Sequence, residues 1–401
     1  MISHGATPPL DAKGAKIGGW LVCHGGRFIS HGEAPALNAN DVTIGGSLFC
    51  DGGQFLSRGA TPALNVNGAK IDKSVLLRWD FKAEGGVDLT GATIQGNLEC
   101  DGGQFINEGA MPALNADSAK IDASVFLREG MTVEGRVHFA YADVTHDFQW
   151  RGVKSPQKAI LDLRFAKVGR LWNDKNSWPN KGNLSLGGFV YDEIDDSASP
   201  NADMQLGWLH RQPQIPFLSQ PYEQLAGVLS KRGLKEDARK VMIEKNKDYA
   251  AHLHWRPAWL WYGFFGKIIG YGYSPWRAFW ISLFVIGIGS FLFNAGYKSK
   301  LLTPLDKRVY VEREEKFHLS ELYPRFNALV YSVETFVPLL KLGTSEYWAP
   351  NDTRHHGSLK VGNLVLPLSG RFLRYYLWFH IIAGWVLTSL WVGGLTGLVK
   401  T

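Results

Sequence analysis

Two long apolar stretches stand out in the last third of the chain. Residues 278–295 (AFWISLFVIGIGSFLFNA) carry no charge, and neither do residues 375–399 (YYLWFHIIAGWVLTSLWVGGLTGLV). A helix needs about 20 apolar residues to cross a bilayer core of about 30 Å. The pattern therefore predicts two transmembrane helices, 276–297 and 374–399.

A third apolar segment, 323–343 (YPRFNALVYSVETFVPLLKLG), lies between the two predicted helices and is too short to be another span. The pattern predicts a short helix that enters the membrane and returns to the side from which it came. The flanking segments 298–322 and 344–373 are then loops, the first of them extracytoplasmic.

The first half of the chain follows a different pattern, in which apolar residues recur at spacings of two and Gly, Asn and Asp stand between them. Such spacing is typical of short strands with one face inward, joined by tight corners. A triplet of a small residue, a polar residue and Ile or Val recurs at steps of 27, 27, 23, 27, 23 and 24 residues. Its copies begin at Ala15, Val42, Ala69, Ala92, Ala119, Ala142 and Ala166.

A repeat of this length cannot bury a face alone and must stack on its neighbours. We therefore expect a β-solenoid of about seven coils over residues 1–195. The pattern resembles the pentapeptide-repeat type of solenoid, which implies a right-handed parallel β-helix. The fold class predicted for the whole chain is mixed: this solenoid, an α-helical hairpin connector and an α-helical transmembrane domain.

The cysteines fit the repeat. Cys23, Cys50 and Cys100 occupy one equivalent coil position, which elsewhere holds Leu77 or Leu127. A position shared with leucine predicts a buried apolar side chain, because buried cysteine behaves as a small hydrophobe. The recurring Cys-x-Gly-Gly-x-Phe predicts a corner whose Phe packs over the coil.

Proteins of this appearance are sometimes labelled membrane-associated oxidoreductases. The sequence contains no dinucleotide-binding glycine motif, no haem-attachment motif and no paired cysteines. The histidine pairs His252-x-His254 and His355-His356 lack supporting metal ligands. We therefore expect no enzyme activity, no cofactor and no metal.

Between the two halves, residues 196–219 are rich in Pro, Ser, Asn and Gln and are predicted to be a linker. Residues 220–254 show helical spacing on either side of Gly233, which predicts a cytoplasmic helical hairpin. Its many lysines and arginines are consistent with either a solvated helix face or a contact with anionic lipid.

Residues 255–275 are aromatic on nearly every turn but interrupted by Pro and Gly, which predicts an amphipathic helix lying in the membrane interface. The residues expected at the membrane surface are Trp255, Trp259, Trp261, Lys267, Trp276 and Arg277.

The net charge of +6 is modest and the basic residues form no single stripe, so nucleic-acid binding is not expected. The first residues, MISHGATPPLDAKGAK, show no signal-peptide pattern. We therefore expect a multi-pass protein of a bacterial inner membrane with both termini in the cytoplasm and with lipid as a partner.

The segment between the spans contains Tyr323-Pro324-Arg325 and then, at 328–335, Ala-Leu-Val-Tyr-Ser-Val-Glu-Thr. This resembles the pore helix of bacterial potassium channels, with Phe326 and Asn327 as two extra residues. The resemblance implies a homotetramer, with copies meeting around a pore. It implies that Tyr331, Ser332 and Thr335 support the pore helix and that Glu334 lies behind the filter.

The filter itself departs from that family. Potassium channels continue with Thr-Val-Gly-Tyr-Gly, whose carbonyl groups replace the water around the ion. Here the filter-like positions are Val337, Pro338, Leu340, Lys341 and Gly343. Potassium selectivity is therefore not expected, and a non-selective pore, an anion-tolerant pore and a pore without conduction all stay open.

The second predicted span contains His380, a polar residue that is costly in lipid and is expected to face the helix bundle. Its glycines are expected to allow close packing or an inner-helix gate; they are Gly384, Gly393, Gly394 and Gly397. The leading hypothesis is an oligomeric ion-conducting channel-like protein with a cytoplasmic solenoid that regulates it or docks a protein partner. The alternative is a non-conducting membrane anchor for a scaffold solenoid.

Overall fold

A computed structural model describes residues 1–195, 202–252, 275–306, 310–313, 316–319, 323–354, 357–361 and 364–396, together with the isolated residues 266 and 270. The chain forms two compact units, Met1–His252 and Leu253–Thr401. Most of the predicted interfacial helix, including Trp255, Trp259, Trp261 and Lys267, lies outside the described residues, as does Gly397.

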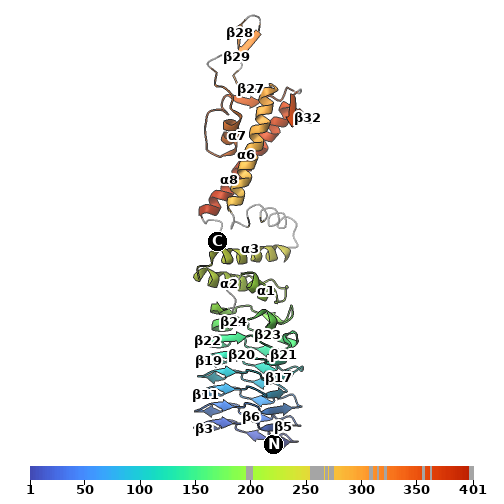
Figure 1. The fold of residues 1–401 in the computed structure, drawn as a ribbon, viewed down its shortest axis with the longest axis vertical. Helices are drawn as coiled ribbons and strands as arrows, with labels where there is room; N and C mark the ends of the chain where they lie inside the picture. The colour runs from blue at the N-terminus through green and yellow to red at the C-terminus, as the bar shows by residue number, and fades with distance from the viewer. Residues whose placement is uncertain are drawn as a thin grey trace. The chain divides into compact units, whose positions relative to one another are not determined.

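The first unit contains a parallel β-solenoid, as the repeat predicts (Figure 1). Its strands form two sheets of 13 strands each, and every pairing within them is parallel. The first sheet consists of β1 (Ile2–Ser3), β2 (Leu10–Asp11), β5 (Arg27–Ser30), β6 (Leu37–Asn38), β9 (Gln54–Ser57), β10 (Leu64–Asn65), β13 (Lys82–Glu84), β14 (Val87–Asp88), β17 (Gln104–Asn107), β18 (Leu114–Asn115), β21 (Thr132–His138), β23 (Ala159–Asp162) and β25 (Leu184–Ser185). The second consists of β3 (Lys16–Ile17), β4 (Leu21–Val22), β7 (Thr43–Ile44), β8 (Leu48–Phe49), β11 (Lys70–Ile71), β12 (Val75–Leu76), β15 (Thr93–Ile94), β16 (Leu98–Glu99), β19 (Lys120–Ile121), β20 (Val125–Leu127), β22 (Asp143–Trp150), β24 (Lys167–Asn173) and β26 (Val190–Asp195).

The recurring triplet sets the register of the solenoid. The apolar third residue of each triplet pairs with its counterpart in the next coil, from Ile17 with Ile44 to Val144 with Val168. The solenoid has about 8 turns rather than the expected seven, because Val168 pairs onward with Tyr191. The eighth copy was missed because the bulky Phe189 and Tyr191 replace the small residue and the Ile or Val of the triplet.

The interior of the coils is apolar. Cys50 and Cys100 are fully buried and Cys23 is 5% exposed, which confirms that they fill the core. Burial raises the pKa of the Cys100 thiol well above its ordinary value, so this thiol stays protonated. Phe28 and Phe55 stack inside the coils with ring centroids 5.0 Å apart, so the Phe of the glycine-rich corner is a core residue.

The difference between long and short coils lies at one corner. The 27-residue coils carry loops 31–36, 58–63 and 108–113 there, whereas the 23-residue coil between Ile71 and Ile94 has only Gly85 and Gly86. Gly86 has a φ of 88°, and a Cβ at this position would lie 2.3 Å from the backbone oxygen of Pro112 in the next coil. The short corner therefore requires glycine.

Helices cover the last coil of the solenoid (Figure 1). The predicted hairpin is present as α2 (Gln220–Lys231) and α3 (Lys235–His252). Gln220 donates to the backbone oxygen of Phe189 at 2.9 Å, and Gln224 donates to that of Tyr191 at 2.6 Å. Because a solenoid end exposes unpaired backbone groups, these glutamines act as a cap.

The segment predicted to be a linker differs from the expectation, because it contains α1 (Ala202–Leu209). Leu206 and Trp208 on this helix are buried in the same core as the solenoid, and the Trp208 ring lies 6.0 Å from that of Trp178. The polar residues around α1 predicted a linker. The helix forms because its apolar side chains are buried against the last coil. Two short 3-10 helices, η1 (Pro156–Lys158) and η2 (Lys175–Ser177), complete this unit among the described residues.

The second unit is built on two long helices, α6 (Pro275–Lys298) and α8 (Gly370–Thr396), which pack against each other. Within them, Trp276–Lys298 and Gly370–Gly393 are long and apolar enough to cross a membrane, in agreement with the two predicted spans. Between them in sequence come α7 (Ala328–Phe336) and three two-stranded antiparallel sheets. The strand pairs are β27 (Leu302–Pro304) with β30 (Trp348–Pro350), β28 (Tyr310–Arg313) with β29 (Lys316–Leu319), and β31 (Gly357–Val361) with β32 (Leu364–Leu368).

Candidate functional site

The start of α7 is fixed by the two residues that the pore-helix resemblance treats as extra. Asn327 is the N-cap, and its side-chain oxygen accepts from the backbone N–H groups of Leu329 and Val330. Phe326 stacks on Tyr297, at the C-terminal end of α6, with ring centroids 4.8 Å apart. Capping satisfies orphan donors of the first turn, so Asn327 specifies where the helix begins.

The other end of α7 lies halfway along both long helices. Ser332 donates to the backbone oxygen of Ile286 at 2.8 Å, and Ile286 is near the middle of α6. A Cβ on Gly384, near the middle of α8, would lie 1.8 Å from the backbone oxygen of Phe336. The α7 helix therefore runs from the Tyr297 end of α6 to the midpoint of the helix pair, where Gly384 permits backbone contact.

His380 joins α8 to α7. Its side chain is fully buried, and its Nε2 atom lies 3.2 Å from the Ser332 hydroxyl and 3.1 Å from the Ser332 backbone oxygen. Its Nδ1 atom lies 3.4 Å from the hydroxyl of Tyr376, one turn earlier on α8. The histidine thus points into the unit, and both of its ring nitrogens have polar neighbours.

Glu334 holds the chain that follows α7. Its carboxylate accepts from the backbone N–H groups of Gly343 at 3.0 Å, Thr344 at 2.8 Å and Ser345 at 2.9 Å. The Ser345 hydroxyl donates to the same carboxylate at 2.9 Å. Bonds to an ionised acceptor are among the stronger hydrogen bonds in proteins. Glu334 therefore fastens residues 343–345 back against the helix.

The segment between α7 and this attachment, residues 337–342, is irregular and largely exposed. Leu339 is 92% exposed and adopts a φ of 68°, and Lys341 is also exposed. The chain reverses direction in this segment. Its return is shown by the backbone N–H of Leu305, which donates to the backbone oxygen of Tyr347 at 2.9 Å, next to the strand pair β27–β30. The chain thus goes to the midpoint of α6 and α8 and comes back to the end where it started.

An aromatic cluster marks that end. Trp348 packs against Tyr297, Phe326 and Tyr323, and its indole N–H donates to the backbone oxygen of Pro324 at 3.0 Å. Sequence patterns do not single out Trp348, because its partners lie more than 20 residues away along the chain.

The structure brings together some of the predicted site residues and separates others. Tyr331, Ser332, Glu334, His380 and Gly384 meet where α7 contacts the long helices or its own return segment. Thr335 donates within α7, to the backbone oxygen of Tyr331 at 2.7 Å. The filter-like positions Val337, Pro338, Leu340 and Lys341 lie in the loop after α7. Gly393 and Gly394 lie near the end of α8, and Trp276 and Arg277 are exposed at the start of α6.

The comparisons with known proteins found no matching family model, no matching curated protein and no matching solved structure. The likeness of residues 323–335 to a potassium-channel pore helix therefore depends on the residues themselves.

Proposed function

We propose that this chain is one subunit of an oligomeric, channel-like membrane protein in which α7 is a re-entrant pore-type helix. The observation that carries the proposal is the path of residues 323–350. The helix contacts the middle of α6 through Ser332 and the middle of α8 through its last residue, Phe336, and an irregular, largely exposed segment follows it.

Such a segment is incompatible with lipid. Within the hydrocarbon core, irregular backbone is tolerated only where protein buries it or where it lines a water-filled cavity. Within one copy of the described chain, residues 339–342 are exposed and have no such protein cover, whereas Val337 and Pro338 are partly buried. A closed ring of identical subunits supplies both, because neighbouring copies cover one side of the segment and a central water-filled pathway lies on the other.

The chemistry of the loop determines what such a pore would conduct. The C-terminal end of α7 directs the negative end of its dipole toward the loop, which favours a cation. Lys341 adds a positive charge at the same place, while the Glu334 carboxylate is engaged by three backbone N–H groups. A weakly selective or anion-tolerant pathway agrees better with these charges than potassium selectivity does.

In this proposal the solenoid unit stays in the cytoplasm of a bacterial cell, where both termini lie, and acts as a regulatory or docking domain. Homotetrameric assembly follows from the pore-helix resemblance. We assign the chain no enzymatic role.

A non-conducting anchor is the second candidate, and the composition of the loop favours it. Val337, Pro338, Leu339, Leu340 and Leu342 present apolar side chains where a filter needs carbonyl groups. Four such loops meeting at an axis would make a hydrophobic plug that excludes water. The chain would then hold its solenoid at the membrane as a scaffold for a protein partner.

The experiment is a conductance measurement on full-length protein in planar bilayers, preceded by native mass spectrometry in nanodiscs. We expect one closed oligomer and discrete conductance steps. Lys341→Glu should shift the reversal potential toward cation preference in asymmetric KCl, whereas Lys298→Glu, at the exposed end of α6, should not. A closed oligomer without conductance would favour the anchor, and a single isolated copy would exclude both the pore and the plug.

A further inference from the structure

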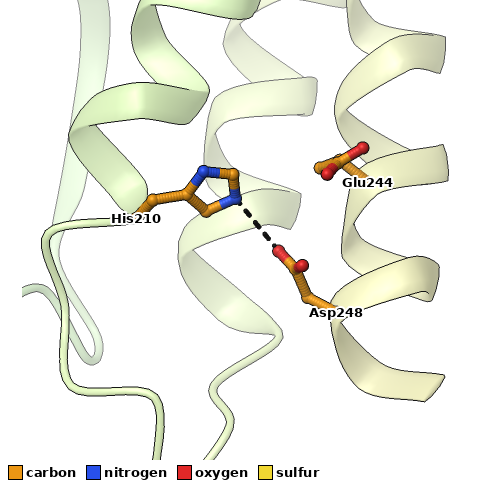
Figure 2. A group of neighbouring side chains, drawn as sticks. All are labelled: His210, Glu244 and Asp248. Atoms are coloured by element: carbon orange, nitrogen blue, oxygen red, sulfur yellow. Dashed lines mark hydrogen bonds and ion pairs between the residues drawn. The ribbon is translucent and has the colours of Figure 1, made fainter. Parts of the chain in front are cut away.

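Three potential metal-ligating side chains converge among helices α1 to α3, and one of them lies more than 30 residues from the other two in the sequence (Figure 2). Glu244 and Asp248 are one turn apart on α3, and His210 follows the last residue of α1. Figure 2 shows the His210 ring directed at Asp248, with Glu244 on the next turn of the same helix. One ligand atom from each of the three lies within 4.8 Å of the other two.

The distances suit a small divalent ion. Zinc binds imidazole nitrogen and carboxylate oxygen at about 2.0–2.2 Å, which places tetrahedral ligand atoms roughly 3.4 Å apart. His210 Nε2 already lies 3.1 Å from Asp248 Oδ2. Glu244 is only partly buried, so its side chain can turn to close the third distance. Its exposed partner Lys247, at 2.8 Å, can move away into solvent.

The ligand that links the cluster is itself held in place. Tyr222 on α2 donates its hydroxyl to Asp248 Oδ2 at 2.6 Å. Carboxylates that bind metals are normally oriented by hydrogen bonds of this kind. Asp248 therefore has a supporting partner on a third element, which an accidental surface ion pair does not need.

A cavity of about 190 Å³ opens beside the cluster and gives an ion a path from solvent. Its lining includes His210, Asp248, Tyr222 and Gln212, with Lys181 at its wall. The Gln212 Oε1 atom is buried and has no hydrogen-bond partner among the described residues. This oxygen is available to accept from a water molecule bound to the ion.

We propose that His210, Glu244 and Asp248 form a zinc site with an open coordination position toward this cavity. An N/O/O donor set suits zinc, and three protein ligands leave the fourth position for water. The ion would tie the end of α1 to α3, and so fasten together the helices that cap the last coil of the solenoid. Neither this role nor this site depends on whether the second unit conducts ions.

The test is zinc binding to full-length protein that carries no histidine tag and has been stripped with a chelator. Isothermal titration should show one saturable zinc site per chain. His210→Ala should weaken binding by about 100-fold or more and Glu244→Gln by about 10-fold or more, because loss of a ligand should cost at least as much as loss of an outer-shell partner, which costs about 10–100-fold. His146→Ala, at an exposed histidine of the solenoid, and Glu236→Gln, at an exposed carboxylate of α3, are the matched controls and should bind as the wild type does.

X-ray absorption at the zinc edge gives a second reading that does not depend on the variants. We expect one imidazole nitrogen, with oxygen atoms filling the rest of the shell. The proposal is overturned if the stripped protein takes up no zinc, if the shell contains no imidazole, or if His210→Ala and Glu244→Gln, with circular dichroism unchanged, bind as tightly as the two controls.

Discussion

The two units of this protein differ in how far their apolar side chains are buried. In the solenoid unit a continuous core extends from Cys23 to Val241, and coil stacking buries the first and third residues of nearly every triplet. In the second unit, only 22% of the most apolar window of α6 and 17% of that of α8 are buried. Large exposed apolar surfaces mark interaction or membrane sites, so the exposed faces of α6 and α8 suit contact with a membrane or with another protein surface.

The hydrogen bonding of polar groups also differs between the two units. Solenoid backbone groups are paired mainly by neighbouring coils, as in a sheet. In the second unit, specific side chains make the key connections: Asn327 caps α7, His380 contacts Ser332, and Glu334 binds residues 343–345. Single substitutions should therefore have local effects in the second unit and cooperative effects along the solenoid.

The largest effect is expected from Gly384→Leu. A side chain here would displace the backbone of Phe336, so α7 cannot keep its contact with α8. Overpacking against backbone should cost about 3 kcal/mol or more and unfold the second unit locally. Limited proteolysis should cut within residues 323–350, while the β-sheet circular dichroism of the solenoid stays unchanged.

The matched control is Gly287→Leu, since no atom lies within 4 Å of a Cβ at that position. Equal proteolytic sensitivity of the two variants would show that α7 does not pack against α8 as described.

The solenoid should respond next most strongly, to Leu77→Ala. Leu77 is fully buried at the position that Cys50 and Cys100 occupy in neighbouring coils. Removal of a buried leucine side chain costs about 2–5 kcal/mol. Urea unfolding followed by circular dichroism should shift accordingly for the whole first unit. Leu218→Ala, at a site that is 43% exposed, should change stability far less.

Glu334→Gln should loosen the return segment. The amide keeps one acceptor oxygen where the carboxylate has two, so the four hydrogen bonds to residues 343–345 cannot all form. We expect a loss of about 2 kcal/mol, in the range for hydrogen bonds to charged groups. Hydrogen exchange at the amides of residues 343–345 should accelerate by roughly 30-fold, since each 1.4 kcal/mol is a factor of ten. Glu346→Gln, at an exposed site, should leave that exchange unchanged.

The smallest expected effect is on how the stability of the first unit depends on pH. Burial alone would raise the pKa of Asp162, but hydrogen bonds from Arg164 outweigh it and hold the pKa below its ordinary value. A lowered pKa stabilises the fold above the unfolded-state pKa, and this contribution is lost as pH falls through the folded-state value. Asp162→Asn should cost about 1.5 kcal/mol at pH 7 and nothing at the acid end of the range. Unfolding of the first unit measured across pH 2–7 tests this, with the exposed Asp143→Asn as control.

Sequence periodicity predicted the solenoid because each coil repeats the same contacts. The register of Ile17, Ile44 and Ile71 follows directly from the spacing of the triplets. The α1 helix escaped prediction for the opposite reason, since its eight residues occur once and are stabilised by the solenoid end.

The candidate site was only partly predictable. Hydropathy located α6 and α8, and the Ser-Val-Glu-Thr string located α7. The attachment of Glu334 to residues 343–345 could not be read from the sequence, because it depends on how the chain turns at Leu339. The pairing of His210 with Asp248 was hidden for a related reason: the segment that holds the histidine was predicted to be a linker.

The corner that distinguishes long coils from short ones has an evolutionary consequence. Loops 31–36, 58–63 and 108–113 add length sideways, and the strands on either side of each loop still pair in register with those of adjacent coils. Insertions and deletions in these loops therefore leave the stacking of the coils unchanged. Natural variation can lengthen or shorten the loop of one coil at a time, without a compensating change elsewhere in the chain.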